Sequence, residues 1–237
     1  MGNKLAIVTG ASGDIGKIIC ESLIKDEFSV VGIDLIPVKN EHKYTHVTGP
    51  VESITSISEV FTIVKRFKPD FLVLVNNAGI TLPSSEDIET WNKTILINLT
   101  APYMWMSAFA NYFEEVRCQG RIISVTSLSA ELSFPNNPSY AASKGGLKQL
   151  TKAFGYRLGE LGICCNNVGP GYIETKFNQN SLNNIDAYNS RKNRSMLKRW
   201  GLPIEVAKAI SFLASDGANF ITCQDIYVDG GWISKGI

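Results

Sequence analysis

Seven short apolar runs alternate with longer stretches of helical periodicity, and this rhythm constrains the fold more than any other feature of the chain. The runs are rich in β-branched residues and apolar at consecutive positions, which is typical of strands covered on both faces of a parallel sheet. They are KLAIVTG (4–10), FSVVGID (28–34), KYTHVTG (43–49), DFLVLVNNAG (70–79), GRIISVTS (120–127), GICCNNVGPG (162–171) and QDIYVDGG (224–231).

The segments between the runs carry apolar residues at three- and four-residue spacing, as crossover helices do. We expect helices at 15–26, 54–67, 91–116, 140–161 and 204–215. This order predicts a doubly wound α/β fold. Because no linker, charge run or repeat divides the 237 residues, we expect a single domain, 1–237. Segment 175–199, rich in asparagine and basic residues, breaks the rhythm and is predicted to be a substrate lid.

Composition argues against several classes of protein. The formal net charge is +1, so no strong field attracts nucleic acid or an anionic membrane. No apolar run reaches the roughly 18 residues of a membrane span, and the first residues do not resemble a signal peptide. The five cysteines form no C-x-x-C pair, which favours reduced thiols in the cytoplasm. His42 and His46 lie in a strand-like stretch without a nearby cysteine, so we expect no metal site.

The stretch TGASGDIG, residues 9–16, joins the first strand to the first helix. Gly10 allows a tight turn, and Gly16 allows the helix to approach the strand closely. The amides at the start of the helix can then face a pyrophosphate, which predicts a dinucleotide site. An ordinary tight turn between a strand and a helix is the alternative.

Asp34 ends the second apolar run, eighteen positions after Gly16. An acidic residue at this place accepts hydrogen bonds from the adenosine ribose and repels a 2′-phosphate. We therefore favour NAD(H) over NADP(H), the alternative being a solvated aspartate at the end of a strand.

Tyr140 and Lys144 are four residues apart in a predicted helix and so share one face. A phenol has a pKa of about 10, and acid–base work near neutrality would need a decrease of roughly three units, about 4 kcal/mol. We expect the Lys144 ammonium to cause this decrease. Taken alone, the spacing is far better explained as a pair on a helix surface. However, Ser127 lies at the C-terminal end of a strand, where open α/β sheets collect ligand-binding residues.

Together these motifs resemble the short-chain dehydrogenase/reductase family over nearly the whole chain. The resemblance rests on TGASGDIG, NNAG (76–79), INLT around Asn98, Ser127, Tyr140-x-x-x-Lys144, PGYIET (170–175) and VDGG (228–231). It implies a Rossmann-like sheet of seven parallel strands with helices on both faces. It also implies a nicotinamide cofactor across the C-terminal strand ends, a small-molecule substrate and a homodimer or homotetramer.

The resemblance also implies roles for single residues. Tyr140 would be the acid/base, Ser127 would orient the substrate oxygen, and Lys144 would lower the phenol pKa and bind the nicotinamide ribose. Asn98 would hold a water that connects the lysine to solvent. The expected cofactor-binding residues are Gly10, Ser12, Gly13, Asp14, Ile15, Gly16, Asp34, Val51, Asn77, Tyr140, Lys144, Ile173 and Thr175. For Asn98 and Asn77, the alternative is that the side chains only tie backbone in turns.

Three positions depart from the family pattern. Asp14 replaces a glycine in the turn, so its side chain must point away from the phosphates. Pro50, before Val51, removes a side-chain contact to adenine. Cys223 replaces a glycine near the C-terminus, where we expect only packing to change.

The predicted lid holds many asparagines and basic residues but few large apolar ones, and Phe134, Asn136 and Asn137 follow Ser127. This composition favours a small polar substrate, such as a sugar or a hydroxy acid. A lid that is simply solvated when open would have the same composition. The competing functions are a 3-oxoacyl thioester reductase (acyl carrier protein type) that uses NADP(H), and a cofactor-binding regulator without turnover.

Overall fold

A computed structural model describes residues 3–82, 87–132, 134 and 137–235. Its seven strands form one parallel sheet in the order β3-β2-β1-β4-β5-β6-β7. All seven apolar runs contribute a strand, so the predicted Rossmann-like fold is confirmed. The strands are Lys4–Thr9 (β1), Ser29–Asp34 (β2), Tyr44–Thr48 (β3), Phe71–Asn76 (β4), Gln119–Val125 (β5), Cys164–Pro170 (β6) and Asp225–Val228 (β7).

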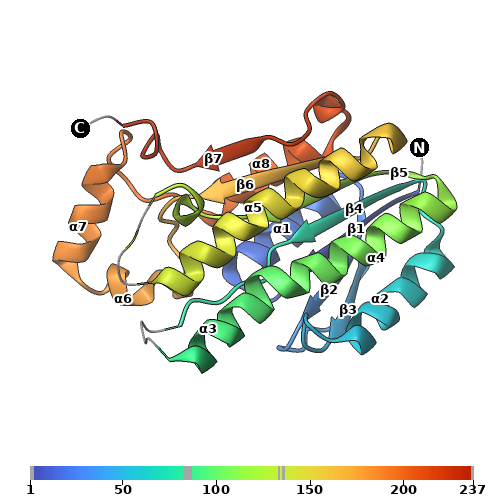
Figure 1. Cartoon of the computed structure of the whole chain (residues 1–237), viewed down its shortest axis with the longest axis horizontal. Coiled ribbons are helices and arrows are strands. Elements are labelled where there is room, and N and C mark those ends of the chain that lie inside the picture. The colour runs from blue at the N-terminus through green and yellow to red at the C-terminus, as the bar shows by residue number, and fades with distance from the viewer. Residues whose placement is uncertain (1–2, 83–86, 133, 135–136, 236–237) are drawn as a thin grey trace.

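Helices cover both faces of the sheet (Figure 1). Asp14–Lys25 (α1) and Pro203–Ala214 (α8) lie on one face, while Ile54–Phe67 (α2), Ala101–Val116 (α4) and Pro138–Leu158 (α5) lie on the other. Alternate strand residues serve the two sides, because successive side chains of a strand point in opposite directions. In β1, Leu5 and Ile7 join the core beneath α2, α4 and α5, whereas Ala6 and Val8 join the core beneath α1 and α8.

The helix expected at 91–116 is interrupted by a wider turn. It consists of Ile88–Ile95 (α3), a π-helical turn at Leu96–Thr100, and α4. Pro102 explains the interruption, because it has no N–H to donate to the carbonyl of Asn98 four residues earlier. The Ala101 amide instead donates to the Leu96 carbonyl, five residues back. The carbonyl of Asn98 is thereby left without its normal helical donor.

Segment 175–199 lies at the edge of the sheet to which the strand arrowheads point (Figure 1). It contains a 3-10 turn at Lys176–Asn178 and two short helices, Gln179–Leu182 (α6) and Ile185–Arg194 (α7). Other 3-10 turns lie at Leu128–Ala130, Gly159–Leu161 and Asp216–Ala218. Within the described residues, no helix combines the length and the apolar character needed to cross a membrane.

Cys223 adopts a left-handed backbone conformation, with φ of 59°. Its amide donates to the Cys165 carbonyl at 2.7 Å, which holds the turn before β7 against β6. The thiol packs on α5 at Gly155, where an added Cβ would lie 2.5 Å from Sγ. The substitution of glycine by Cys223 thus changes packing, as expected, and it requires a glycine opposite.

This contact predicts a compensating pair of substitutions. Gly155→Ala should destabilise the native chain by about 1–3 kcal/mol because the new methyl group overlaps the Cys223 thiol. In a Cys223→Gly background, the same change should stabilise by up to about 1 kcal/mol, as alanine does within helices. Urea denaturation of the two single variants and the double variant measures this coupling. Gly145→Ala, on the same helix with nothing within 4 Å of the added Cβ, is the control, and additive free energies would contradict the prediction.

Candidate active site

The start of α5 places Tyr140 and Lys144 at the C-terminal edge of the sheet. Asn137 caps this helix by accepting from the Tyr140 amide at 3.3 Å. Its Nδ2 donates to Thr81 Oγ1 at 2.5 Å, so the helix start is tied to the segment that follows β4. Tyr140 is half-buried and Lys144 is buried, with 3% of its surface exposed.

Lys144 lies beneath the ends of β4 and β5. Its Nζ donates to the Val125 carbonyl at 2.8 Å. A Cβ on Gly79 would come within 3.3 Å of Nζ, so a larger residue would crowd the ammonium group. Burial lowers the pKa of Lys144 to about 8, because desolvation disfavours the charged form. The Nζ lies 5.7 Å from the centroid of the Tyr140 ring, so the structure brings the predicted pair together.

The phenol of Tyr140 does not show the expected decrease in pKa. Burial raises its pKa to about 12, and the nearby Tyr172 contributes in the same direction. A hydrogen bond with Ser127 opposes this rise but does not overcome it. Lys144 cannot offset the burial, because its ammonium is itself desolvated and donates to a backbone carbonyl. The chain alone therefore keeps the phenol protonated at neutral pH, ready to donate a proton.

Ser127 is held in the turn that follows β5. Its Oγ accepts from the Ser129 amide at 3.2 Å and begins the 3-10 turn Leu128–Ala130. The hydroxyl is thus fixed beside Tyr140 by local backbone bonding. The prediction that Ser127 and Tyr140 share one substrate oxygen requires this proximity.

The side chains of Asn98 and Asn77 tie backbone segments, which is the alternative left open by the sequence. Asn98 accepts from the Ile80 amide at 2.8 Å and donates to the Ile80 carbonyl at 2.9 Å. Asn77 donates to the carbonyls of Thr9 at 3.0 Å and Gly10 at 3.1 Å. Asn98 Nδ2 also donates to Ser143 Oγ at 3.2 Å, so both asparagines make hydrogen bonds within the chain. The Asn98 Oδ1 and the Lys144 Nζ both lie beside Gly79, at 3.5 Å and 3.3 Å from the position of an added Cβ.

The glycine turn has the shape that a phosphate needs. Gly10 has φ of +66°, and a Cβ on Gly16 would collide with the Gly10 carbonyl. Gly13 caps α1 without any side-chain hydrogen bond. The first amides of the helix, at Asp14 and Ile15, have no intrahelical acceptor, and they carry the positive end of the helix dipole. These features fit the pyrophosphate of a dinucleotide.

Asp34 lies beside this turn at the end of β2. Its carboxylate accepts from the amides of Ser12 at 3.0 Å and Ile36 at 3.1 Å. The Ser12 hydroxyl also donates to the Ile36 carbonyl at 2.8 Å. A carboxylate has about four lone-pair sites, so two remain for a further donor. The aspartate therefore shapes the turn and places negative charge at its rim.

The departures at Asp14 and Pro50 have local explanations. The Asp14 carboxylate accepts from the Lys176 amide at 2.5 Å, so it points toward segment 175–199 and away from the turn, as the sequence required. After Pro50, the Val51 carbonyl accepts from Trp105 Nε1 at 2.8 Å. The Val51 carbonyl is thus already bonded, and its side chain is half-buried.

Ile173 and Thr175 are buried just beyond β6. Thr175 Oγ1 donates to the Ile173 carbonyl at 3.3 Å, and Asn178 Nδ2 donates to the same carbonyl at 2.8 Å. These bonds hold the backbone at the start of segment 175–199. The Asp14 carboxylate, at the start of α1, bonds the next residue of that segment, Lys176.

Three asparagines of segment 175–199 make hydrogen bonds within the chain. Asn184 caps α7 by accepting from the Ala187 amide at 2.9 Å, and Asn183 accepts from Gln179 at 2.8 Å. Asn178 bonds the backbone as described above, and Asn137 caps α5. Asn136, also expected near the substrate, lies outside the described residues. Of these four amides, those of Asn184 and Asn137 cap helices.

Aromatic rings form a wall that the sequence did not reveal. Trp232 stacks on Tyr172 at 5.2 Å between centroids, and Trp200 meets the same ring edge-on at 5.2 Å. Phe134 contacts Trp232 at 6.3 Å, and Phe177 lies 6.2 Å from the Tyr140 ring. These residues come from distant parts of the chain and follow no period, so only the folded topology assembles them.

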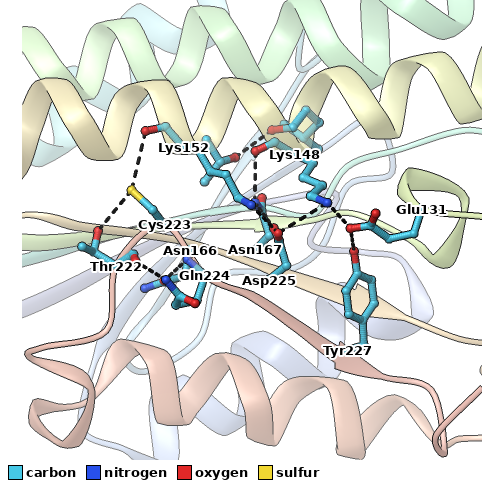
Figure 2. Close-up of polar contacts among 12 residues, drawn as sticks. Glu131, Lys148, Lys152, Asn166, Asn167, Thr222, Cys223, Gln224, Asp225 and Tyr227 are labelled. Carbon is cyan, nitrogen blue, oxygen red and sulfur yellow. Dashed lines mark hydrogen bonds and ion pairs between the residues drawn. The ribbon is translucent and has the colours of Figure 1, made fainter. Parts of the chain in front are cut away.

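A polar network holds α5 to β7 and to the turn after Ser127 (Figure 2). Glu131 accepts from Lys148 and, at 2.6 Å, from the Tyr227 hydroxyl. Asp225 accepts from Lys152 at 2.5 Å and lies 3.6 Å from Lys148. The hydrogen bonds from Lys148 and Tyr227 lower the pKa of the Glu131 carboxyl group. The network thus connects α5, β7 and the turn after Ser127 to one another.

Comparisons with known proteins agree with this geometry. A family model described as enoyl-(acyl carrier protein) reductase matches residues 11–233. The 3-oxoacyl-(acyl-carrier-protein) reductase FabG of Buchnera aphidicola subsp. Acyrthosiphon pisum is 33% identical, over 96% of each chain. Glucose 1-dehydrogenase 2 of Bacillus subtilis is 29% identical, over 96% of this chain and 94% of that protein. A structure of 4-hydroxyisoleucine dehydrogenase complexed with NADH superposes with a TM-score of 0.91 at 28% identity, over 99% of this chain and 100% of that chain.

The buried ammonium predicts a pH-dependent stability difference. The pKa of Lys144 is about 8 in the folded chain and about 10.4 in the unfolded chain, so between these values the unfolded chain binds more protons. The free energy of unfolding of the native chain should therefore rise by up to about 3 kcal/mol across this window. Lys144→Met removes the titrating group and therefore this rise. The free energy of unfolding of the variant, minus that of the native chain, should therefore decrease from pH 8 to pH 10.

Urea denaturation at several pH values measures the difference. Lys65→Met, at an exposed position on α2, is the control for the loss of one lysine. A constant difference between the Lys144→Met variant and the native chain would show that the ammonium is not desolvated.

Proposed function

The chain belongs to the short-chain dehydrogenase/reductase family, and we propose that it transfers a hydride between NAD(H) and the alcohol or carbonyl group of a small polar substrate. The substrate is of the sugar or hydroxy-acid type. The observation that carries this proposal is the convergence of Ser127, Tyr140 and Lys144 at the strand ends, on the same edge of the sheet as the open amides of the glycine turn.

In this proposal, each of the three side chains has a separate role. Ser127, already hydrogen-bonded to the phenol, orients the substrate oxygen beside it. Tyr140, protonated at neutral pH, donates its proton to that oxygen during reduction and takes it back during oxidation. Lys144, whose Nζ lies 5.7 Å from the centroid of the Tyr140 ring, would return a proton to the phenol through a water held by Asn98. The dinucleotide, when bound, supplies or accepts the hydride.

The preference for NAD(H) is supported by the charge beside the glycine turn. The Asp34 carboxylate would repel a 2′-phosphate and accept a hydrogen bond from a ribose hydroxyl. The turn residues Ser12 and Gly13 offer no cation that would bind a phosphate. Similar structures are complexed with NADH in one case and with NADP in others, so the preference rests on the charge of Asp34.

A 3-oxoacyl thioester reductase is the second candidate, favoured by the 33% identity to FabG. Such a substrate presents a long acyl chain, which calls for an extended apolar surface. Here the wall near Tyr140 combines aromatic rings with arginine side chains, as at Tyr172 and Arg191. This combination supports a compact, polar substrate. Turnover of hydroxy acids, sugars and acyl thioesters, measured from the absorbance of NADH, distinguishes the two functions. Turnover of thioesters alone would contradict our proposal.

Tyr140→Phe tests whether the chain is an enzyme or a cofactor-binding regulator. Loss of the general acid should lower kcat by about 100-fold or more, whereas the Kd for NADH should change by less than about threefold. Steady-state kinetics and NADH fluorescence titration measure the two quantities. Tyr156→Phe, on the exposed side of the same helix, is the control and should leave both unchanged.

Two outcomes would contradict the proposal. A Tyr140→Phe variant with the native kcat would remove the phenol from the chemistry. A native chain that does not bind NADH would remove the cofactor.

A further inference from the structure

Asp14, the first residue of α1, stands where the family pattern has a glycine, and the proposed function gives no role to its carboxylate. The carboxylate accepts from the Lys176 amide at 2.5 Å, across 162 positions of the chain. Among the hydrogen bonds of the described residues, this is the only one that joins α1 to segment 175–199. The departure from glycine therefore creates a contact between two separate elements.

The carboxylate caps a turn that has no side-chain cap of its own. Lys176 is the first residue of the 3-10 turn Lys176–Asn178, so its amide has no acceptor within the turn. Thr175, the residue before it, does not accept from the turn, and its Oγ1 instead donates to the Ile173 carbonyl at 3.3 Å. Asp14 thus supplies, from another element, the acceptor that an N-cap side chain usually supplies.

The other hydrogen bonds near this turn do not connect it to α1. Asn178 Nδ2 donates to the Ile173 carbonyl at 2.8 Å, and the Asn178 amide donates to the Thr175 carbonyl at 3.0 Å. The Glu174 amide donates to the Gly201 carbonyl at 2.9 Å. These bonds fix the shape of the turn and the backbone before it, whereas the Asp14 bond fixes the turn relative to α1.

An open groove of about 520 Å³ lies between α1 and the start of segment 175–199. Ile18 and Glu21 line it on α1, and Leu182 lines it on α6. Asp14 and Lys176 also line the groove, so their hydrogen bond crosses a gap that side chains do not fill. Without this bond, the two elements are free to separate here.

The turn that Asp14 caps carries Phe177 to the catalytic tyrosine. The Phe177 ring lies 6.2 Å from the Tyr140 ring, measured between centroids, and 49% of the residue is exposed. Half of Phe177 therefore has no packing partner within the chain, and the backbone of the turn must hold the ring in place. A shift of the turn away from α1 would change the distance between the two rings.

We propose that Asp14 is a positioning residue, which holds the turn Lys176–Asn178 on α1 and thereby keeps Phe177 against Tyr140. The helix that is expected to bind the pyrophosphate is thus also the support for one wall beside the phenol. This inference rests on the proposed function for the role of Tyr140, whereas the capping bond can be tested without turnover.

Two substitutions of Asp14 separate the hydrogen bond from the charge. Asp14→Asn and Asp14→Ala both remove the negative charge, but asparagine keeps a carbonyl oxygen that can accept from the Lys176 amide. In the chain without ligands, NMR should show hydrogen exchange of this amide about tenfold or more faster in Asp14→Ala than in the native chain, as expected for loss of a charged hydrogen bond. In Asp14→Asn the exchange rate should stay closer to the native value.

The same spectra test whether the bond positions the ring. Nuclear Overhauser effects between the rings of Phe177 and Tyr140 should be observed in the native chain and in Asp14→Asn, and should weaken in Asp14→Ala. In kinetics, kcat/KM should be about tenfold lower in Asp14→Ala than in Asp14→Asn, a difference of about 1.4 kcal/mol. Phe177→Ala should lower kcat/KM of the native chain but cause little further loss in Asp14→Ala, because both substitutions act on one contact.

Glu21→Ala is the matched control, since it removes an acidic side chain that lines the same groove from the same helix. It should leave the exchange of the Lys176 amide and the ring-to-ring signals as in the native chain. Native exchange in Asp14→Ala, or additive losses in the Asp14 and Phe177 double variant, would overturn the inference. Failure of NADH binding or of turnover would instead overturn the proposed function, and the spectra of the chain without ligands would remain readable.

Discussion

The site depends on the burial of Lys144 beneath the ends of two parallel strands. Its ammonium donates to the last carbonyl of β5 and lies against Gly79, which follows β4. This single contact sets how deeply α5 enters the sheet edge and therefore where Tyr140 lies. The cost is visible in the lowered pKa of the lysine, as expected when a protein desolvates a charge to place it. Residues whose pKa values are strongly shifted by burial are common at functional sites.

The ends of the neighbouring strands hold the remaining parts of the site in register with this lysine. Asn77 joins the end of β4 to the glycine turn after β1, and Asn98 joins the segment after β4 to the π turn before α4. Asp14 then connects the start of α1 to the backbone of Lys176. Through these bonds, the turn shaped for a pyrophosphate and the start of segment 175–199 belong to one continuous set of contacts.

Much of the fold was predictable because the sheet is covered on both faces. Continuous apolar runs identified all seven strands, and helical spacing located α1, α2, α5 and α8. The break between α3 and α4 could have been inferred from Pro102, which removes the donor to Asn98. The aromatic wall could not, because Tyr172, Trp200 and Trp232 have no common spacing and meet only across the sheet edge. Composition also does not separate an asparagine that caps a helix, such as Asn184, from one that faces a ligand. The phenol pKa was predicted in the wrong direction because spacing shows that a cation is near, but not how much water both groups lose.

The central claim is that the glycine turn and the Ser127–Tyr140–Lys144 group serve one bound dinucleotide. A crystal structure of the chain with NAD⁺ tests it most directly. We predict the pyrophosphate at the amides that begin α1, a ribose hydroxyl on the Asp34 carboxylate, and the nicotinamide ring beside Tyr140. A dinucleotide whose pyrophosphate lies away from residues 10–16, or whose nicotinamide lies far from Tyr140, would contradict the account.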